Sequence, residues 1–507
     1  MIRAYPGRAS VLPGDSLVLH VATDSRHFRV HFHRWGDGFQ AMHTSNWLPG
    51  ERAPERGAGD DWHWPAYTFA IPAHWPSAVY IAHLEEAPGG PVHSAAESAA
   101  DSAARSAAHS SFHSSAHSAD YQSAHASASS SAHSSFRFPA PSLALNRAAA
   151  LFVVRSARSA DAGAPPRGML YKLPLATYHA YNHSGGACYY DQPPRSLDPP
   201  GARVSLQRPG GGIGGPVWGA PDHYDAASPR QTFAHWDARF IRWLARQGYA
   251  PDFCTDLDIH HDPALPLRYR LLVSVGHDEY WTEPTRDAVE DFVASGGNAA
   301  FFAANLCWWR VHLAEHGTAL VCHQGSARGA FDHWWPAGGA GRPEERLSGA
   351  SYRHGGGWWD GARHTRGFLV QQPEHWVFEG TGLREGEALG ADTWPPLAGY
   401  ECDGAPLDAF DLVRGRATLS AWADESGTPD SYQLLAACPL DRRWQELPPR
   451  ERHAAGEGVH AATMGVFERG GTVFSAGTTD WAQVLADGRD RRVERITRNV
   501  LDRLLRH

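Results

Sequence analysis

The chain has 507 residues, 42% hydrophobic and 20% charged, with a formal net charge of -9. This length predicts two or three domains, and the mild charge without a basic stripe argues against a nucleic-acid partner. No stretch reaches the roughly 18 consecutive apolar residues of a membrane-spanning helix, and the first residues lack the apolar segment of a secretion signal. Six cysteines without a CxxC pair predict reduced thiols and a cytoplasmic location.

The N-terminal part has the pattern of short β-strands. Apolar and polar residues alternate in four runs bounded by turn residues, as expected for strands with one buried face. These runs are Ser16–Thr23, Phe28–Gly36, Pro76–Glu86 and Ala150–Ala157. We predict a small antiparallel β-sandwich over residues 1–158.

A Ser/Ala/His-rich segment at about residues 91–138 interrupts the predicted sandwich. Its composition buries too little apolar surface to offset chain entropy, so we predict a disordered insertion. His109, His113 and His117 have helical spacing and could bind a transition metal if the segment became helical. A repeat expansion without a site is the favoured interpretation.

Residues 159–507 alternate between strand and helix patterns. Leu271–Val275 is a continuous apolar strand, and the next helix has Thr282 as its predicted N-cap and Pro284 in its first turn. This rhythm predicts a parallel sheet covered by helices on both faces. The predicted class is α/β, a parallel-sheet glutaminase-like (doubly wound) catalytic domain after the sandwich.

Polar side chains follow the most apolar strand at His277, Asp278, Glu279 and Tyr280. In open parallel sheets ligands bind beyond the carboxyl ends of the strands, so this position favours a functional site. The alternative is that the acids cap the next helix and the aromatic rings pack in the loop. The same rule selects four further segments, Ala176–Gly186, Asp256–Asp262, Ala398–Gly404 and Ser475–Ala482.

Two other motifs are weak. Gly210, Gly212 and Gly215 form a GxGxxG pattern, but no strand precedes it and Pro216 follows, which predicts a mobile glycine loop rather than a dinucleotide site. Cys307 follows a strand, where glutaminase-like folds carry a nucleophilic thiol. It lacks a tight glycine-flanked turn, so a buried inert thiol is the preferred interpretation.

Seven motifs in order resemble the large (catalytic) subunit of N,N-dimethylformamidase and its relatives. They are TYHAYNHSGG, VSLQRP, TDLDIH, VSVGHDEYW, FVASGGNAAFFAANLCWW, GYECDG and VFSAGTTDW, and the resemblance covers roughly Gly168 to His507. It implies a hydrolase of small formamide or N-alkyl amides that uses mononuclear ferric iron held by two tyrosines and one glutamate. It also implies a separate small subunit, and we expect an oligomer.

By this resemblance the metal ligands are Tyr280, Glu401 and Tyr181, with Tyr178 as the competitor of Tyr181. Phenolate and carboxylate oxygens suit ferric iron, which could polarise an amide carbonyl or activate a bound water. Four further residues are candidates for proton transfer or orientation: His277, Glu279, Asn182 and His183.

Two other functions remain open. The first is a hydrolase on the same scaffold with a zinc or ferrous site made by His277, Asp258 and His260. The second is a non-catalytic protein that binds a carbohydrate or a partner through exposed tryptophans. The tryptophans considered are Trp308, Trp309, Trp334, Trp335, Trp358 and Trp359.

Overall fold

A computed structural model describes residues 1–88, 148–157, 166–191, 203–219, 221–324, 332–441, 443–444, 459–486 and 488–506. The predicted insertion at 91–138, with His109, His113 and His117, lies outside the described residues, as does the predicted domain boundary at residue 158.

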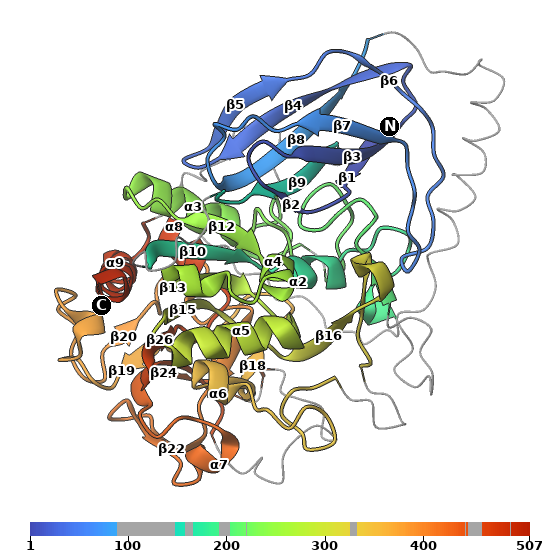
Figure 1. The fold of residues 1–507 in the computed structure, drawn as a ribbon. Coiled ribbons are helices and arrows are strands. Elements are labelled where there is room, and N and C mark those ends of the chain that lie inside the picture. Colours follow the sequence, from blue (N-terminus) through green and yellow to red (C-terminus); the bar gives the residue numbers. More distant parts are fainter. Residues whose placement is uncertain are drawn as a thin grey trace, which may run out of the picture.

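The N-terminal strands form two sheets, drawn at the top of Figure 1. One has the order β1 (Ile2–Pro6), β3 (Ser16–Thr23), β7 (Ala66–Ala70). The other has the order β2 (Ser10–Val11), β9 (Ala149–Val154), β8 (Ala78–Glu86), β4 (His27–Trp35), β5 (Phe39–Thr44), with β6 (Leu48–Pro49) paired to β4. The four predicted strands are present as β3, β4, β8 and β9, and all pairings are antiparallel except β2 with β9.

A nine-stranded mixed sheet forms the centre of the rest of the chain. Its order is β12 (Asp252–Thr255), β10 (Arg167–Leu173), β13 (Tyr269–His277), β15 (Asn298–Ala304), β26 (Gly471–Ser475), β25 (Ala461–Arg469), β24 (Gln433–Pro439), β19 (Phe368–Val370), β20 (Ala388–Leu389). The first five strands pair in parallel and the last four pair antiparallel. The antiparallel half was not predicted.

Helices cover both faces of the parallel strands (Figure 1). Val273 and Val275 of β13 belong to the core that includes residues of α3 (Asp237–Arg246), α8 (Trp481–Ala486) and α9 (Arg491–Arg506). Leu272 points the other way, into the core formed with α5 (Glu283–Ala294). Successive side chains of a strand face opposite sides, so a strand that is apolar throughout needs cover on both faces.

The helix signals in the sequence act as expected. The Thr282 side chain accepts a hydrogen bond from the backbone N–H of Thr285 and caps α5, with Pro284 in its first turn. The other described elements are α2 (Leu175–Ala180), α4 (Asp256–His261), α6 (Glu345–Ser348), α7 (Ala423–Ser426), η2 (Tyr189–Asp191), η3 (Pro266–Arg268), η4 (Glu315–Gly317), η5 (Trp376–Phe378), β11 (Arg203–Ser205), β14 (Tyr280–Thr282), β16 (Trp309–Leu313), β17 (Ala319–Val321), β18 (Ser351–Gly357), β21 (Glu401–Gly404), β22 (Leu407–Asp411) and β23 (Arg416–Leu419).

The order of the strands marks one position along the carboxyl ends of the sheet. β12 lies on one side of β10 while β13, β15 and β26 lie on the other, so the winding reverses between β10 and β13. Ligands in open α/β sheets bind at such a reversal, beyond the carboxyl ends. The glutaminase-like, doubly wound class stays a prediction, whereas the position of this edge follows from the strand pairings.

Two segments differ in detail from their predictions. Asp256–His261, expected as the loop after a strand, is helix α4 because Thr255 and Asp258 form a reciprocal capping box at its start. The glycine loop packs against α2, where a Cβ atom on Gly212 would lie 2.7 Å from the Tyr178 ring, and against Asn182 just after the helix, 2.2 Å from a Cβ atom on Gly210. No helix in the described part of the chain is long and apolar enough to cross a membrane.

Candidate active site

Two phenols and a buried carboxylate meet beyond the carboxyl ends of the neighbouring strands β10 and β13. Tyr181 follows α2 after the end of β10, and Glu279 follows β13. The Tyr181 hydroxyl donates to Oε2 of Glu279 at 2.7 Å and lies 2.7 Å from the hydroxyl of Tyr190. Tyr190 in turn donates to Oε1 and Oε2 of Glu279 at 3.0 and 3.2 Å. We call Tyr181, Tyr190 and Glu279 the oxygen triad.

The last residues of β13 and the turn after the strand position Glu279 in this cluster. Gly276 has φ +75°, and a Cβ atom there would lie 2.6 Å from the Trp236 side chain, so only glycine fits. Asp278 points away from the triad and accepts a bond from buried Lys172 at 2.5 Å. The Thr177 hydroxyl on α2 accepts the backbone N–H of Glu279 at 3.0 Å. These two contacts therefore connect the carboxyl ends of β10 and β13 next to the triad.

Tyr280 is a third phenol beside the triad and is fully buried. Its hydroxyl donates to the hydroxyl of Tyr190 at 2.7 Å and accepts from Nε2 of Gln324 at 2.8 Å. Burial, followed by the charge of Glu279, raises the pKa of Tyr181, Tyr190 and Tyr280 well above the ordinary value of 10. All three phenols are therefore neutral at neutral pH in the absence of a cation.

A second group, His277 and Glu401, adjoins the triad. Nε2 of His277 lies 2.7 Å from Oε2 of Glu401 and 3.4 Å from Oε2 of Glu279. Burial alone would lower the pKa of His277, but Glu401 raises it above its ordinary value. Burial would raise the pKa of Glu401, but His277 holds it below its ordinary value. Both shifts favour the ion pair of an imidazolium and a carboxylate over the neutral forms.

Three side chains fix this ion pair. Gln231 accepts from Nδ1 of His277 at 2.7 Å, so both imidazole nitrogens have an acceptor. Asn305 donates to Oε2 of Glu401 at 3.0 Å, and the Trp359 indole N–H donates to Oε1 at 3.1 Å.

The pKa of Glu279 is shifted because its side chain is buried between the phenols and the His277–Glu401 pair. Burial raises its pKa to about 7, and the charge of Glu401 acts in the same direction, while His277 opposes it. A carboxylic acid that titrates near neutrality next to three phenols is typical of a functional cluster, because burying such polar groups only to fill space would destabilise the fold.

The structure brings the three predicted ligands, Tyr181, Tyr280 and Glu401, into this one neighbourhood. It also separates Tyr181 from its competitor, because the Tyr178 hydroxyl donates to buried Asp237 instead. Of the three, Tyr181 is in the oxygen triad. Tyr280 contacts the triad through the Tyr190 hydroxyl.

The four predicted proton-transfer candidates divide into two pairs. His277 and Glu279 lie in the cluster. The Asn182 amide instead donates to the Pro209 carbonyl at 2.9 Å and accepts the N–H of Ser184 at 3.0 Å, so it holds the glycine loop. The backbone N–H of His183 donates to the carbonyl of Pro216 at 2.9 Å, at the same loop.

Sequence reasoning missed Tyr190 and Asn305. Asn305 directly follows β15 and could have been found by the same rule that selected His277, since it lies at a carboxyl end. Tyr190 comes from the short helix η2, which gives no periodic signal. Its one sequence cue is the pair Tyr189–Tyr190 shortly after Tyr181.

The residues of the zinc or ferrous alternative have separate partners. Asp258 caps α4 and pairs with Arg155 at 3.3 Å, while His260 contacts the Thr282 hydroxyl at 2.8 Å. His277 pairs with Glu401. These contacts give the alternative no support.

The surface expected for a carbohydrate or partner is largely internal. Trp308, Trp309 and Trp334 are buried, and Trp359, which is 38% exposed, binds Glu401 through its indole N–H. Cys307 is buried, and burial raises the pKa of its thiol, as expected for an inert cysteine. None of the six cysteines, all of which the structure describes, forms a disulfide.

Comparison with known proteins identifies the family of this chain. The profile of the family described as N,N-dimethylformamidase beta subunit-like, C-terminal matches residues 28–494. The chain belongs to this N,N-dimethylformamidase beta subunit-like family. The match starts inside the β-sandwich, so this family region includes most of the N-terminal domain in addition to the expected part from Gly168 onward.

Two curated relatives are similar to part of the chain. They are the N,N-dimethylformamidase beta subunits of Alcaligenes sp and Paracoccus aminophilus, each 26% identical over 302 residues. The aligned region is 53% of this chain and 36% of each relative, so the chain spans about a third of the relatives' length.

Proposed function

We propose that this protein hydrolyses small amides of the formamide or N-alkyl amide type to a carboxylic acid and an amine, using mononuclear ferric iron. Family membership and the names of the two relatives support an amidohydrolase. The observation that carries the proposal is the oxygen triad, in which two phenols and one carboxylate lie within 3.2 Å of one another.

The spacing of the triad fits one hard cation. Oxygen ligands at about 2.0–2.2 Å from a metal ion lie about 3 Å apart, and the triad distances are 2.7, 2.7 and 3.0 Å. The expected set of two tyrosines and one glutamate is best matched here by Tyr181, Tyr190 and Glu279. We therefore propose Tyr190 and Glu279 as ligands in place of Tyr280 and Glu401.

The chemistry of these donors also fits. Buried phenols with raised pKa values give up their protons only to a strongly charged cation, and hard anionic oxygens suit ferric iron better than zinc. Such an ion would supply Lewis-acid chemistry, polarising an amide carbonyl or acidifying a bound water.

The adjacent ion pair supplies the proton transfers. Amide hydrolysis needs a base that takes a proton from water and an acid that gives one to the departing nitrogen. Glu401, ionised and held by Asn305 and Trp359, is the proposed base. His277, protonated and held by Gln231, is the proposed acid.

Two aromatic rings lie between this cluster and solvent. Trp218 is 39% exposed and stacks on Tyr190 with ring centroids 4.8 Å apart, and Trp359 is 38% exposed. Flat apolar rings beside the triad suit a small N-alkyl amide. Since both relatives are named beta subunits, we also propose a separate partner subunit and an oligomeric assembly.

Metal analysis, an absorption spectrum and an amide assay test this proposal together. The purified chain should contain about one iron, show a visible phenolate-to-iron band, and release dimethylamine from N,N-dimethylformamide. Formamide serves as the second substrate, and Glu401→Gln serves as the control that keeps iron but loses turnover. A colourless protein that binds zinc stoichiometrically and retains amidase activity would contradict the ferric site.

A further inference from the structure

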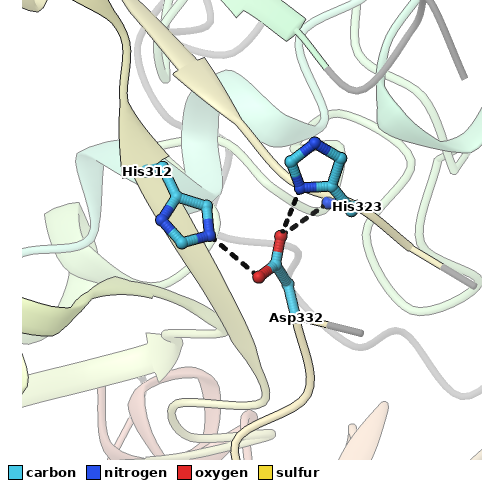
Figure 2. A group of neighbouring side chains, drawn as sticks. All are labelled: His312, His323 and Asp332. Atoms are coloured by element: carbon cyan, nitrogen blue, oxygen red, sulfur yellow. Dashed lines mark hydrogen bonds and ion pairs between the residues drawn. The ribbon is translucent and has the colours of Figure 1, made fainter. Parts of the chain in front are cut away.

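A second cluster of metal-binding side chains lies outside the oxygen triad, beside the β16–β17 hairpin (Figure 2). His312 is on β16, His323 comes two residues after β17, and Asp332 lies between the two rings. Nε2 of His312 is 2.8 Å from Oδ1 of Asp332, and Nδ1 of His323 is 3.0 Å from Oδ2. One ligand atom from each residue lies within 4.8 Å of the others.

The carboxylate of Asp332 is fixed and ionised. Its side chain is 2% exposed, and the backbone N–H of His323 donates to Oδ2 at 2.7 Å. Burial would raise the pKa of Asp332, but the bonds from His312 and His323 hold it below its ordinary value. The histidine side chains are 44% and 37% exposed, so a cation can reach the cluster without opening the core.

We propose that His312, His323 and Asp332 bind one Zn²⁺ ion, independently of the proposed amidase centre. Two imidazoles and a carboxylate form a set of three protein ligands that leaves a position for water. Ligand atoms about 2.0–2.1 Å from tetrahedral zinc lie about 3.3 Å apart. The two nitrogen–oxygen contacts are 2.8 and 3.0 Å, to different oxygens of Asp332, and the three ligand atoms lie within 4.8 Å of one another, so a small rotation of these side chains would complete the site. The donors also differ in kind from the phenol-rich triad, which favours harder cations.

The guanidinium of Arg310 would compete with a zinc ion for the carboxylate of Asp332. Nε and Nη2 of Arg310 lie 3.3 Å from Oδ1 of Asp332, while Nη1 is 3.9 Å from Glu283. A bound cation would repel Arg310 and leave Glu283 as its partner. Removing this positive charge with Arg310→Gln should therefore tighten zinc binding about tenfold or more.

The position of the cluster indicates what the ion would do. Gln324 directly follows His323 and donates at 2.8 Å to the hydroxyl of Tyr280, a buried phenol of the candidate active site. An ion that joins β16, the end of β17 and Asp332 would stabilise the β16–β17 hairpin and the contact of Gln324 with Tyr280. Its role is structural support next to the site, with no part in the proton transfers.

The test uses the full chain as purified, zinc chloride titrated calorimetrically, and metal analysis after gel filtration. The wild type should bind one zinc per chain, and His312→Ala should weaken that binding by about 100-fold or more. Mg²⁺ should not bind at the cluster, since histidine-rich sites disfavour it. The matched control is His316→Asn on the connecting turn, where His316 is exposed with φ +66° and Asn tolerates that conformation.

The proposal fails if His312→Ala and His323→Ala bind zinc as the wild type does, or if His316→Asn loses binding equally. It also fails if Arg310→Gln weakens zinc binding, since the guanidinium would then be supporting the site. Zinc held at the oxygen triad would persist in His312→Ala and disappear in Tyr190→Phe, so failure of this site and failure of the amidase centre give different results.

Discussion

Replacing Tyr190 by phenylalanine separates the two ligand sets for iron. The change removes one hydroxyl that contacts Tyr181 and Tyr280 at 2.7 Å and Glu279 at 3.0 Å. The phenyl ring can keep its stacking on Trp218. Tyr181 retains Glu279 and Tyr280 retains Gln324, so we expect a loss of only about 1–3 kcal/mol in unfolding free energy.

The effect on iron binding is measured separately from the effect on folding. Losing one of three anionic ligands should reduce iron affinity by about 100-fold or more, which corresponds to about 2.8 kcal/mol. Any iron that remains has one phenolate instead of two, so the visible band per iron should fall by about half. The measurements are iron content under a competing chelator and absorbance per bound iron, with circular dichroism to establish that the variant is folded.

The matched control is Tyr280→Phe, which removes the phenol one contact further out. If Tyr190 is a ligand, Tyr280→Phe keeps its iron and its full absorbance per iron. The opposite pattern, with iron retained in Tyr190→Phe and lost in Tyr280→Phe, would refute the reasoning from oxygen distances. It would favour the set of Tyr181, Tyr280 and Glu401 instead.

Three further predictions concern acid–base groups and buried charge. Glu401→Gln should lower kcat by about 10²–10⁴-fold with iron content unchanged, measured as amine release alongside metal analysis. Burial raises the pKa of Asp403 from 3.8 to about 7, so between these pH values the folded protein binds a proton that the unfolded chain has released, and stability falls as the pH rises. Asp403→Asn should make the melting temperature depend less on pH over this range, and an unchanged slope would contradict the prediction. Lys172→Met leaves buried Asp278 with hydrogen bonds from Ser274 and Trp281 but without its cation, and should cost about 3–5 kcal/mol in urea unfolding. Arg416→Ala in an exposed pair should cost less than about 1 kcal/mol.

The secondary structure near the site could largely be predicted from local pattern. The continuous apolar run of β13 and the cap and proline of α5 are local signals, and both elements occur where the sequence places them. The antiparallel half of the sheet was missed because strands such as β19 and β20 are short and carry no clear alternation. The strand-end rule selected Ala398–Gly404 and the resemblance assigned Glu401 as a ligand, although β21 lies outside the parallel strands, in a two-stranded sheet with β18.

The sequence by itself determined that polar side chains follow β10 and β13, because a strand's end and its flanking residues are properties of a short stretch of chain. Only the tertiary structure decided which of them meet. Tyr181 and Glu279 are 98 residues apart and Tyr190 and Glu279 are 89 apart, and their contact depends on the parallel pairing of β10 with β13 and on the path of η2. Such convergence arises from the packing of distant elements, which no local periodicity records.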